Sequence, residues 1–370
     1  MIFQNDKISI RQLQALLIMD ILGMGIVVLP KRAAMFAGQD GWIVAILSTL
    51  LACAAAFLIA TAGRIFPEKY FNEYSGAILG RPLGVLLSAG LFAKIMICTG
   101  MELRIFGEIV KQVMLPNTPL YAVSALVVIS GLVAAAAGYE ARARAGEILI
   151  FLAIIPMAIF LVLAAAGADF SNLMPAFGSL LDSPLDRVAL GGGMNMITFT
   201  GIEFLYFVYP FIKSKNAGSV RRASVQAVIT VGAMALVATF VSIAQYGPRI
   251  VAQQKWPVIE LMDGVGVPGS FFERQDALIM SFWIVAVYAM ASAGIFFMAI
   301  LSKSVLKLGG HRRHTLACAL IVYLISLAAA NDETADAVLN FMFIWFGAAY
   351  YFVVPLALIA VARIRGLGAK

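Results

Sequence analysis

The chain has 370 residues, of which 62% are hydrophobic and only 13% charged, with a formal net charge of +7. Soluble domains carry about 25% charged residues, so this composition excludes an ordinary soluble fold and indicates a membrane protein. The apolar runs are continuous rather than alternating, which favours membrane-spanning helices over a β-barrel.

Crossing about 30 Å of hydrocarbon takes roughly 20 apolar residues in a helix, and the chain offers about ten such runs. We therefore expect an all-α membrane protein in which residues 1–370 form a single transmembrane domain. The predicted spans are 10–36, 41–63, 83–110, 119–138, 146–167, 188–211, 222–246, 277–301, 315–330 and 338–362. The first span is too long for a cleaved signal peptide and lacks a small-residue cleavage site, so we expect it to remain as the first helix.

The positive charge is distributed unevenly between alternate connections. Most of the 27 lysines and arginines fall on the side that holds the N-terminus, whereas the connections on the other side hold most of the carboxylates. This asymmetry predicts both termini in the cytoplasm, and it accounts for the net charge without a nucleic-acid partner.

Five predicted spans precede a polar stretch and five follow it. An odd number of spans in each half places the halves in opposite orientations, which predicts a 5+5 inverted repeat. The first repeat covers about 10–167 and the second about 188–362.

The first helix of each predicted repeat contains a weak point. Gly23 and Gly25 precede Pro30, and Gly201 precedes Pro210. Glycine loosens a helix and proline removes a hydrogen-bond donor, so we expect helices 1 and 6 to be discontinuous. Unwound backbone is stable at membrane depth only where it lines a cavity or meets a solute, which indicates a small-solute site. Alternatively, the glycines only allow close helix packing.

Three ionisable residues lie within the predicted spans at similar depths. From a rise of 1.5 Å per residue, Asp20, Lys94 and Glu203 approach one layer of the membrane. We expect a charge cluster that couples ligand occupancy to helix or proton movement; the alternative is a static pair that fixes packing. Arg104 and Glu108 are four residues apart and predict a local ion pair.

Signatures of catalysis and of metal binding are missing from the sequence. The run 191–193 is rich in glycine but no lysine follows it, so it is not a phosphate-binding loop. Cys53, Cys98 and Cys318 lie in apolar runs and are interpreted as packing residues. We therefore expect neither an enzyme nor a cofactor or metal site. The segment 256–262 is amphipathic and could form a lid on the outer surface.

Several short segments together carry a family resemblance. They are 7–13 (KISIRQL), 115–119 (LPNTP), 138–140 (GYE), 201–203 (GIE), 210–212 (PFI), 256–262 (WPVIELM) and 272–277 (FERQDA). On these motifs, which are spread over nearly the whole chain, the sequence resembles the spore germination permeases, the B subunits of nutrient germinant receptors.

The resemblance implies the fold of the amino acid, polyamine and organocation transporter superfamily, with its five-plus-five repeat. It also implies A and C receptor subunits as partners, the spore inner membrane as location, and a small nutrient such as an amino acid as ligand. The ligand contacts implied for helices 1, 3, 6, 8 and 10 are Gly23, Met24, Gly25, Cys98, Met101, Thr200, Gly201, Tyr288, Ser292 and Phe343.

The leading functional hypothesis is a nutrient-sensing membrane subunit that triggers spore germination when its ligand shifts the bundle between states. The alternative is a proton-coupled amino acid transporter that works alone. A structural anchor without a ligand would leave the paired helix interruptions unexplained.

Overall fold

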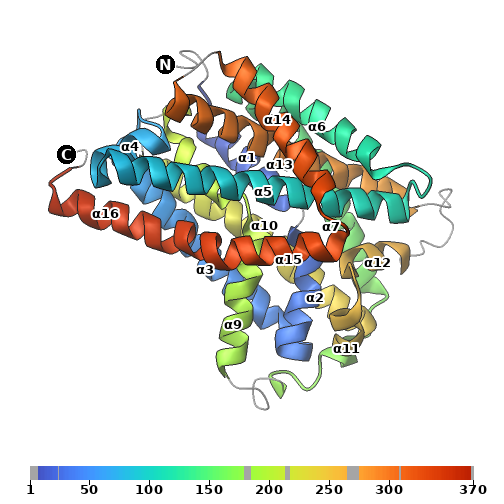
Figure 1. Cartoon of the computed structure of the whole chain (residues 1–370). Helices are drawn as coiled ribbons and strands as arrows, with labels where there is room; N and C mark the ends of the chain where they lie inside the picture. The colour runs from blue at the N-terminus through green and yellow to red at the C-terminus, as the bar shows by residue number, and fades with distance from the viewer. Residues whose placement is uncertain are drawn as a thin grey trace.

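The protein is a bundle of helices (Figure 1). The computed structural model describes residues 7–23, 25–178, 185–212, 217–264, 275–307 and 310–367. Within these ranges the chain forms no strand, and the one β-type contact is an isolated bridge between Ile8 and Ile212. The predicted all-α class is therefore confirmed.

The α-helices follow one another with short connections. They are α1 (Ile10–Leu22), α2 (Gly25–Ala37), α3 (Gly41–Gly63), α4 (Phe71–Leu79), α5 (Arg81–Val113), α6 (Leu120–Ala137), α7 (Tyr139–Ala166) and α9 (Leu185–Asn195). The rest are α10 (Ala217–Tyr246), α11 (Pro248–Gln253), α12 (Pro257–Gly264), α13 (Gln275–Leu306), α14 (His311–Ala328), α15 (Asp332–Met342) and α16 (Val354–Ile364). Between α15 and α16 the chain is π-helical over Phe343–Gly347 and Ala349–Val353.

Seven helical stretches of the described chain are long and apolar enough to cross a membrane. Two of the predicted spans, 188–211 and 315–330, are not among them, and of the span 10–36 only the part from Gly25 is included, in the stretch Gly25–Gly63. The spans 10–36 and 188–211 contain interruptions, and α14 begins with four basic residues at 311–314, which lower its hydropathy. Apolar side chains such as Leu126, Ile148 and Val162 are 70%, 73% and 70% exposed, which fits helix faces that meet lipid.

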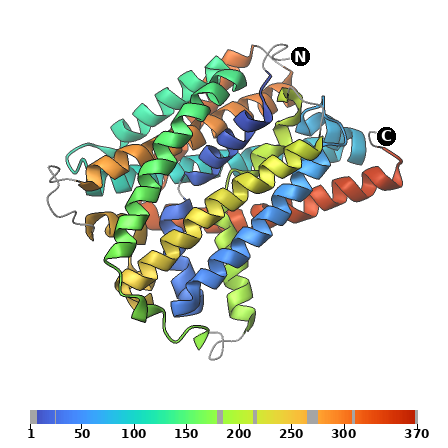
Figure 2. The same ribbon diagram turned by 180° about the vertical axis from the view of Figure 1, so that it is seen from behind.

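Helix α1 lies inside the bundle, against α7, α10 and α13. Figure 2 shows α7 and α10 crossing this side of the molecule. The start of α1 and the end of α16 lie towards the same end of the bundle in both views (Figures 1 and 2). At that end the Ile8 amide donates to Phe211 O at 2.7 Å. Ser9 and Gln12 cap the first turn reciprocally, which fixes the entry of the chain into α1.

One helix begins earlier than the sequence pattern indicates. The apolar run predicts a span from residue 146, but α7 begins at Tyr139, directly after Gly138 in a left-handed conformation (φ 98°). The charged residues between 139 and 147 are therefore helical, and Arg142 lies buried within the bundle.

Candidate functional site

The first interruption lies between α1 and α2. Helix α1 ends at Leu22, Gly23 takes a non-helical conformation (φ −37°, ψ −95°), and α2 begins at Gly25. Trp283 Nε1 of α13 donates to Gly23 O at 2.7 Å, so this freed carbonyl has a buried partner. Met24, a predicted ligand contact, lies outside the described residues.

The second interruption lies between two short 3₁₀ segments that follow α9. Helix α9 is followed by η3 (Met196–Phe199), then Thr200 and Gly201, and then η4 (Ile202–Phe207). Gly201 has φ 111°, a conformation that favours glycine. Its amide donates to Glu203 Oε2 at 2.9 Å, and the Thr200 hydroxyl donates to Ile197 O at 2.7 Å.

The two interruptions lie in direct backbone contact. A Cβ atom placed on Gly25 would overlap the backbone of Thr198, and one placed on Gly201 would lie 2.8 Å from Asp20 O. Each glycine therefore occupies a position where the backbone of the other segment leaves no space for a side chain. Close packing of two backbone segments, one of the two interpretations of these glycines, is therefore found at both positions.

A buried ion pair anchors the second interruption to α5. Lys94 Nζ donates to Glu203 Oε1, and both side chains are 1% exposed. Glu203 Oε2 accepts from the Tyr351 hydroxyl at 2.9 Å as well as from the Gly201 amide. The carboxylate thus has three donors from three parts of the chain, as a charge buried in a membrane protein requires.

Asp20 belongs to a different ion pair. Arg142 Nη2 lies 2.9 Å from Asp20 Oδ1, while Arg142 Nε donates to Ser292 Oγ at 3.0 Å. Of the two carboxylates considered for Lys94, Glu203 is its ion-pair partner, whereas Asp20 pairs with Arg142. The reason is the early start of α7, which brings Arg142 into the bundle.

Each of the remaining predicted ligand contacts is associated with one of these two ion pairs. Cys98 and Met101 follow Lys94 by four and seven residues on α5, so all three share one buried helix face. Phe343 contacts the Tyr351 ring at a centroid distance of 6.0 Å. Tyr288 and Ser292 instead line a small pocket together with Arg142.

Sequence reasoning did not single out three of these residues, Arg142, Trp283 and Tyr351, as parts of a site. Arg142 was placed in a connection because the charged run around it resembles a loop. Trp283 and Tyr351 lie in apolar, aromatic-rich runs, where nothing in the sequence indicates which ring reaches a polar partner.

A pocket of about 650 Å³ is lined by residues of α2, α9 and α15 and of the segment before α12. Its lining includes Val28, three residues after Gly25, and Met194, just before the end of α9. The pocket therefore reaches within one helical turn of Gly25 and within about two turns of Gly201. Arg32 of α2 and Asp336 of α15, which both line this pocket, form an ion pair at 2.6 Å.

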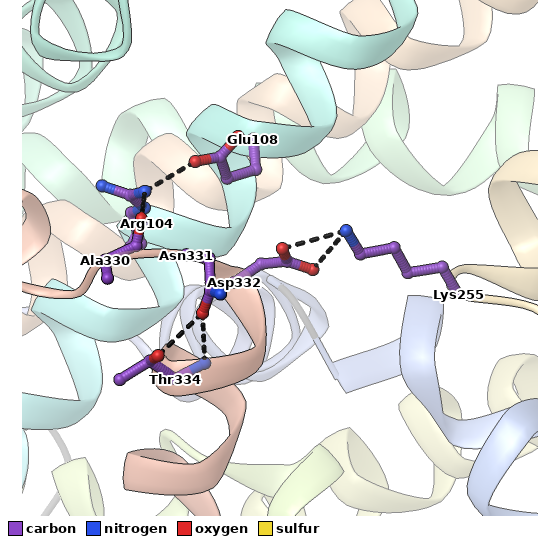
Figure 3. A network of polar contacts seen from close by, with 7 residues as sticks. All are labelled: Arg104, Glu108, Lys255, Ala330, Asn331, Asp332 and Thr334. Atoms are coloured by element: carbon purple, nitrogen blue, oxygen red, sulfur yellow. Dashed lines mark hydrogen bonds and ion pairs between the residues drawn. The ribbon is translucent and has the colours of Figure 1, made fainter.

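A second ion pair at this pocket is drawn in Figure 3. Lys255 Nζ, just before α12, lies 2.8 Å from Asp332 Oδ2 at the start of α15. Asn331 caps that helix by accepting from the Thr334 amide. Arg104 pairs with Glu108, as predicted, and also donates to Ala330 O at 2.8 Å. Helix α5 and the segment before α12 are thus both joined to the start of α15.

In the described ranges, a helical bundle with seven long apolar stretches and buried ion pairs defines a multi-pass membrane protein. Residues 7–335 match the family described as spore germination protein, so the chain belongs to that family.

Relatives cover nearly the whole chain. Spore germination protein YndE of Bacillus subtilis (strain 168) is 25% identical over 99% of this chain and 99% of its own length. Spore germination protein KB of the same organism is 23% identical over 97% of this chain and 95% of its own. Spore germination protein GerLB of Bacillus cereus is 24% identical over 77% of this chain and 76% of its own.

Proposed function

We propose that the chain is the nutrient-sensing membrane subunit of a spore germinant receptor and that its ligand is a small amino acid. The proposal rests above all on one structural feature, the two helix interruptions that meet at Gly25 and Gly201. Membership of the spore germination family supports the biological role. We further propose that A and C receptor subunits are partners and that the chain lies in the spore inner membrane.

The chemistry around the interruptions suits an amino acid. The first turn of α2 has backbone N–H groups without helical partners, and these favour a carboxylate. Carbonyls that become free when the interrupted segments separate favour an ammonium group. Lys94 and Glu203 form an ion pair, so these two side chains together carry no net charge. Cys98 and Met101 add apolar surface for a small aliphatic side chain.

The proposed ligand contacts remain those implied by the resemblance. They are Gly23, Met24, Gly25, Cys98, Met101, Thr200, Gly201, Tyr288, Ser292 and Phe343. Because each of the two glycines is in backbone contact with the other segment here, binding requires the interrupted segments to separate. We propose that the ligand enters through the 650 Å³ pocket and shifts the population towards the separated state.

The proposal includes ten spans in a five-plus-five inverted repeat, with both termini cytoplasmic. The interruptions fall in the first span of each half, where such repeats form their binding sites. The start of α1 and the end of α16 lie at one end of the bundle, as an even number of spans requires (Figure 1).

Germination of spores that carry the intact receptor provides the test. Spores with the wild-type chain should respond to a small amino acid. Spores with Gly25→Ala, in which the added Cβ disfavours the contact with Thr198, should respond at a lower amino acid concentration when the chain is present in the membrane in equal amount. An unchanged response in the variant contradicts the proposal. Uptake of labelled alanine by the purified chain alone in liposomes, driven by a proton gradient, would instead favour the transporter alternative.

A further inference from the structure

A third pocket, separate from the interruptions, lies on the lipid-facing side of the bundle between α1 and α7. It has a volume of about 520 Å³, within the range of small-molecule sites. We call it the α1–α7 groove, and its lining is Arg11, Gln14, Ala15, Ile18, Glu147, Ile150, Phe151 and Ile154. Phe151 is 56% exposed on the surface of the bundle, so the groove is open to the surrounding lipid.

The lining changes from polar to apolar along the helix axes. Arg11 and Gln14 come from the first turns of α1, and Glu147 lies beside them on α7. Ile18 and Ile154 lie seven residues further along their helices, about 10 Å deeper at 1.5 Å per residue. A polar end near the helix starts and an apolar end towards the membrane interior match the orientation of a phospholipid in one leaflet.

The polar end carries one cation and one anion, each without an ion-pair partner in the described part of the chain. Arg11 is exposed, and Glu147 accepts a hydrogen bond from Gln12 Nε2 at 3.1 Å. A guanidinium binds phosphate well, and a carboxylate binds an ammonium group. The two charges are therefore complementary to a zwitterionic headgroup, whereas Glu147 would repel a headgroup of net negative charge.

We propose that the α1–α7 groove is a binding site for one zwitterionic aminophospholipid of the phosphatidylethanolamine type. Its phosphate lies at Arg11, its ammonium group at Glu147, and an acyl chain lies along Ile18, Ile150 and Ile154. The bound lipid connects the two helices that the Asp20–Arg142 ion pair also joins. It thereby stabilises α1 within a few turns of the first interruption.

Native mass spectrometry tests this site. The full-length chain is mixed in detergent with equal amounts of phosphatidylethanolamine and phosphatidylglycerol, and the lipid that stays bound after release from detergent is measured. The wild type should retain one phosphatidylethanolamine with a preference of about tenfold, as one charge-assisted contact predicts. Glu147→Gln should abolish the preference but retain lipid, because the phosphate contact remains. Arg11→Gln should weaken retention of both lipids.

Matched variants separate this site from general attraction to lipid. Glu140→Gln removes a carboxylate of α7 that does not line the groove, and it should keep the wild-type preference. Ile150→Trp fills the apolar part while leaving both charges in place, and it should lose the bound lipid. Equal retention of both lipids by the wild type, an unchanged preference in Glu147→Gln, or full retention in Ile150→Trp would each overturn the proposal.

Discussion

Lys94 of α5 and Glu203 of η4 form an ion pair in which each side chain is 1% exposed. Glu203 lies two residues after the left-handed Gly201, so this pair holds a segment that is not α-helical against a long, regular helix. A buried charge that loses its partner is far more costly than an exposed one, and this contrast supplies a direct test.

Replacing Lys94 with methionine should lower the free energy of unfolding by about 3–5 kcal/mol, because Glu203 would remain charged without its cation. Unfolding of the purified chain in detergent measures this change. Arg144→Met is the matched control, since Arg144 pairs with Glu140 while 72% exposed and its loss should cost less than about 1 kcal/mol. Equal stability of Lys94→Met and wild type would show that the pair is not a structural anchor.

The separate pairing of Asp20 predicts a pattern of energetic coupling. In double-mutant cycles, Asp20→Asn should couple to Arg142→Gln by about 2 kcal/mol and to Lys94→Met by clearly less. The free energies of unfolding of the single and double variants provide both coupling energies. A larger coupling of Asp20 to Lys94 would contradict the ion pairs described here.

The sequence predicted the helical class and the positions of both interruptions. Composition and the backbone freedom of glycine have their effect locally, so neither prediction needs knowledge of tertiary contacts. It also placed Glu203 within reach of Lys94, since depth along a helix follows from residue number. It could not predict Arg142 as the partner of Asp20, because whether a charged run continues a helix depends on tertiary contacts. The hydrogen bond from Tyr351 to Glu203 could not be predicted either, because the π-helical turns before α16 determine the direction of the Tyr351 side chain.

Gly201→Ala should destabilise the chain by about 2–4 kcal/mol. A side chain at φ 111° is strained, and its Cβ would lie 2.8 Å from Asp20 O. Gly193→Ala is the control, because a Cβ there meets no atom within 4 Å. The midpoint of thermal unfolding should therefore be clearly lower for Gly201→Ala than for Gly193→Ala. Similar midpoints would contradict the close contact of the two interruptions.

Tyr351→Phe removes one of the three donors to the Glu203 carboxylate. A hydrogen bond to a charged group contributes about 1.5–3 kcal/mol, so the variant should lose stability within that range. Tyr121→Phe changes a tyrosine that is 59% exposed and should have little effect. If both variants unfold at the wild-type midpoint, Tyr351 does not stabilise Glu203.

Arg32→Gln breaks the ion pair with Asp336 at the wall of the 650 Å³ pocket. If this pocket is the entrance, the variant should raise the rate at which a water-soluble thiol reagent modifies Cys98, which is 4% exposed in the structure. The measurement uses a background with Cys53→Ser and Cys318→Ser. An unchanged rate would argue against entry of the ligand by this route.

Binding of small amino acids to the purified full-length chain, followed by the shift in its unfolding temperature, tests the central claim most directly. At a ligand concentration 100-fold above Kd, binding should stabilise the wild type by about 2.7 kcal/mol. Gly193→Ala should show the same shift, and Gly25→Ala a larger one, because its added Cβ disfavours the contacting state that binding has to open. A shift of wild-type size in Gly25→Ala, or no shift of the wild type with any small amino acid, would contradict a ligand site at the paired interruptions.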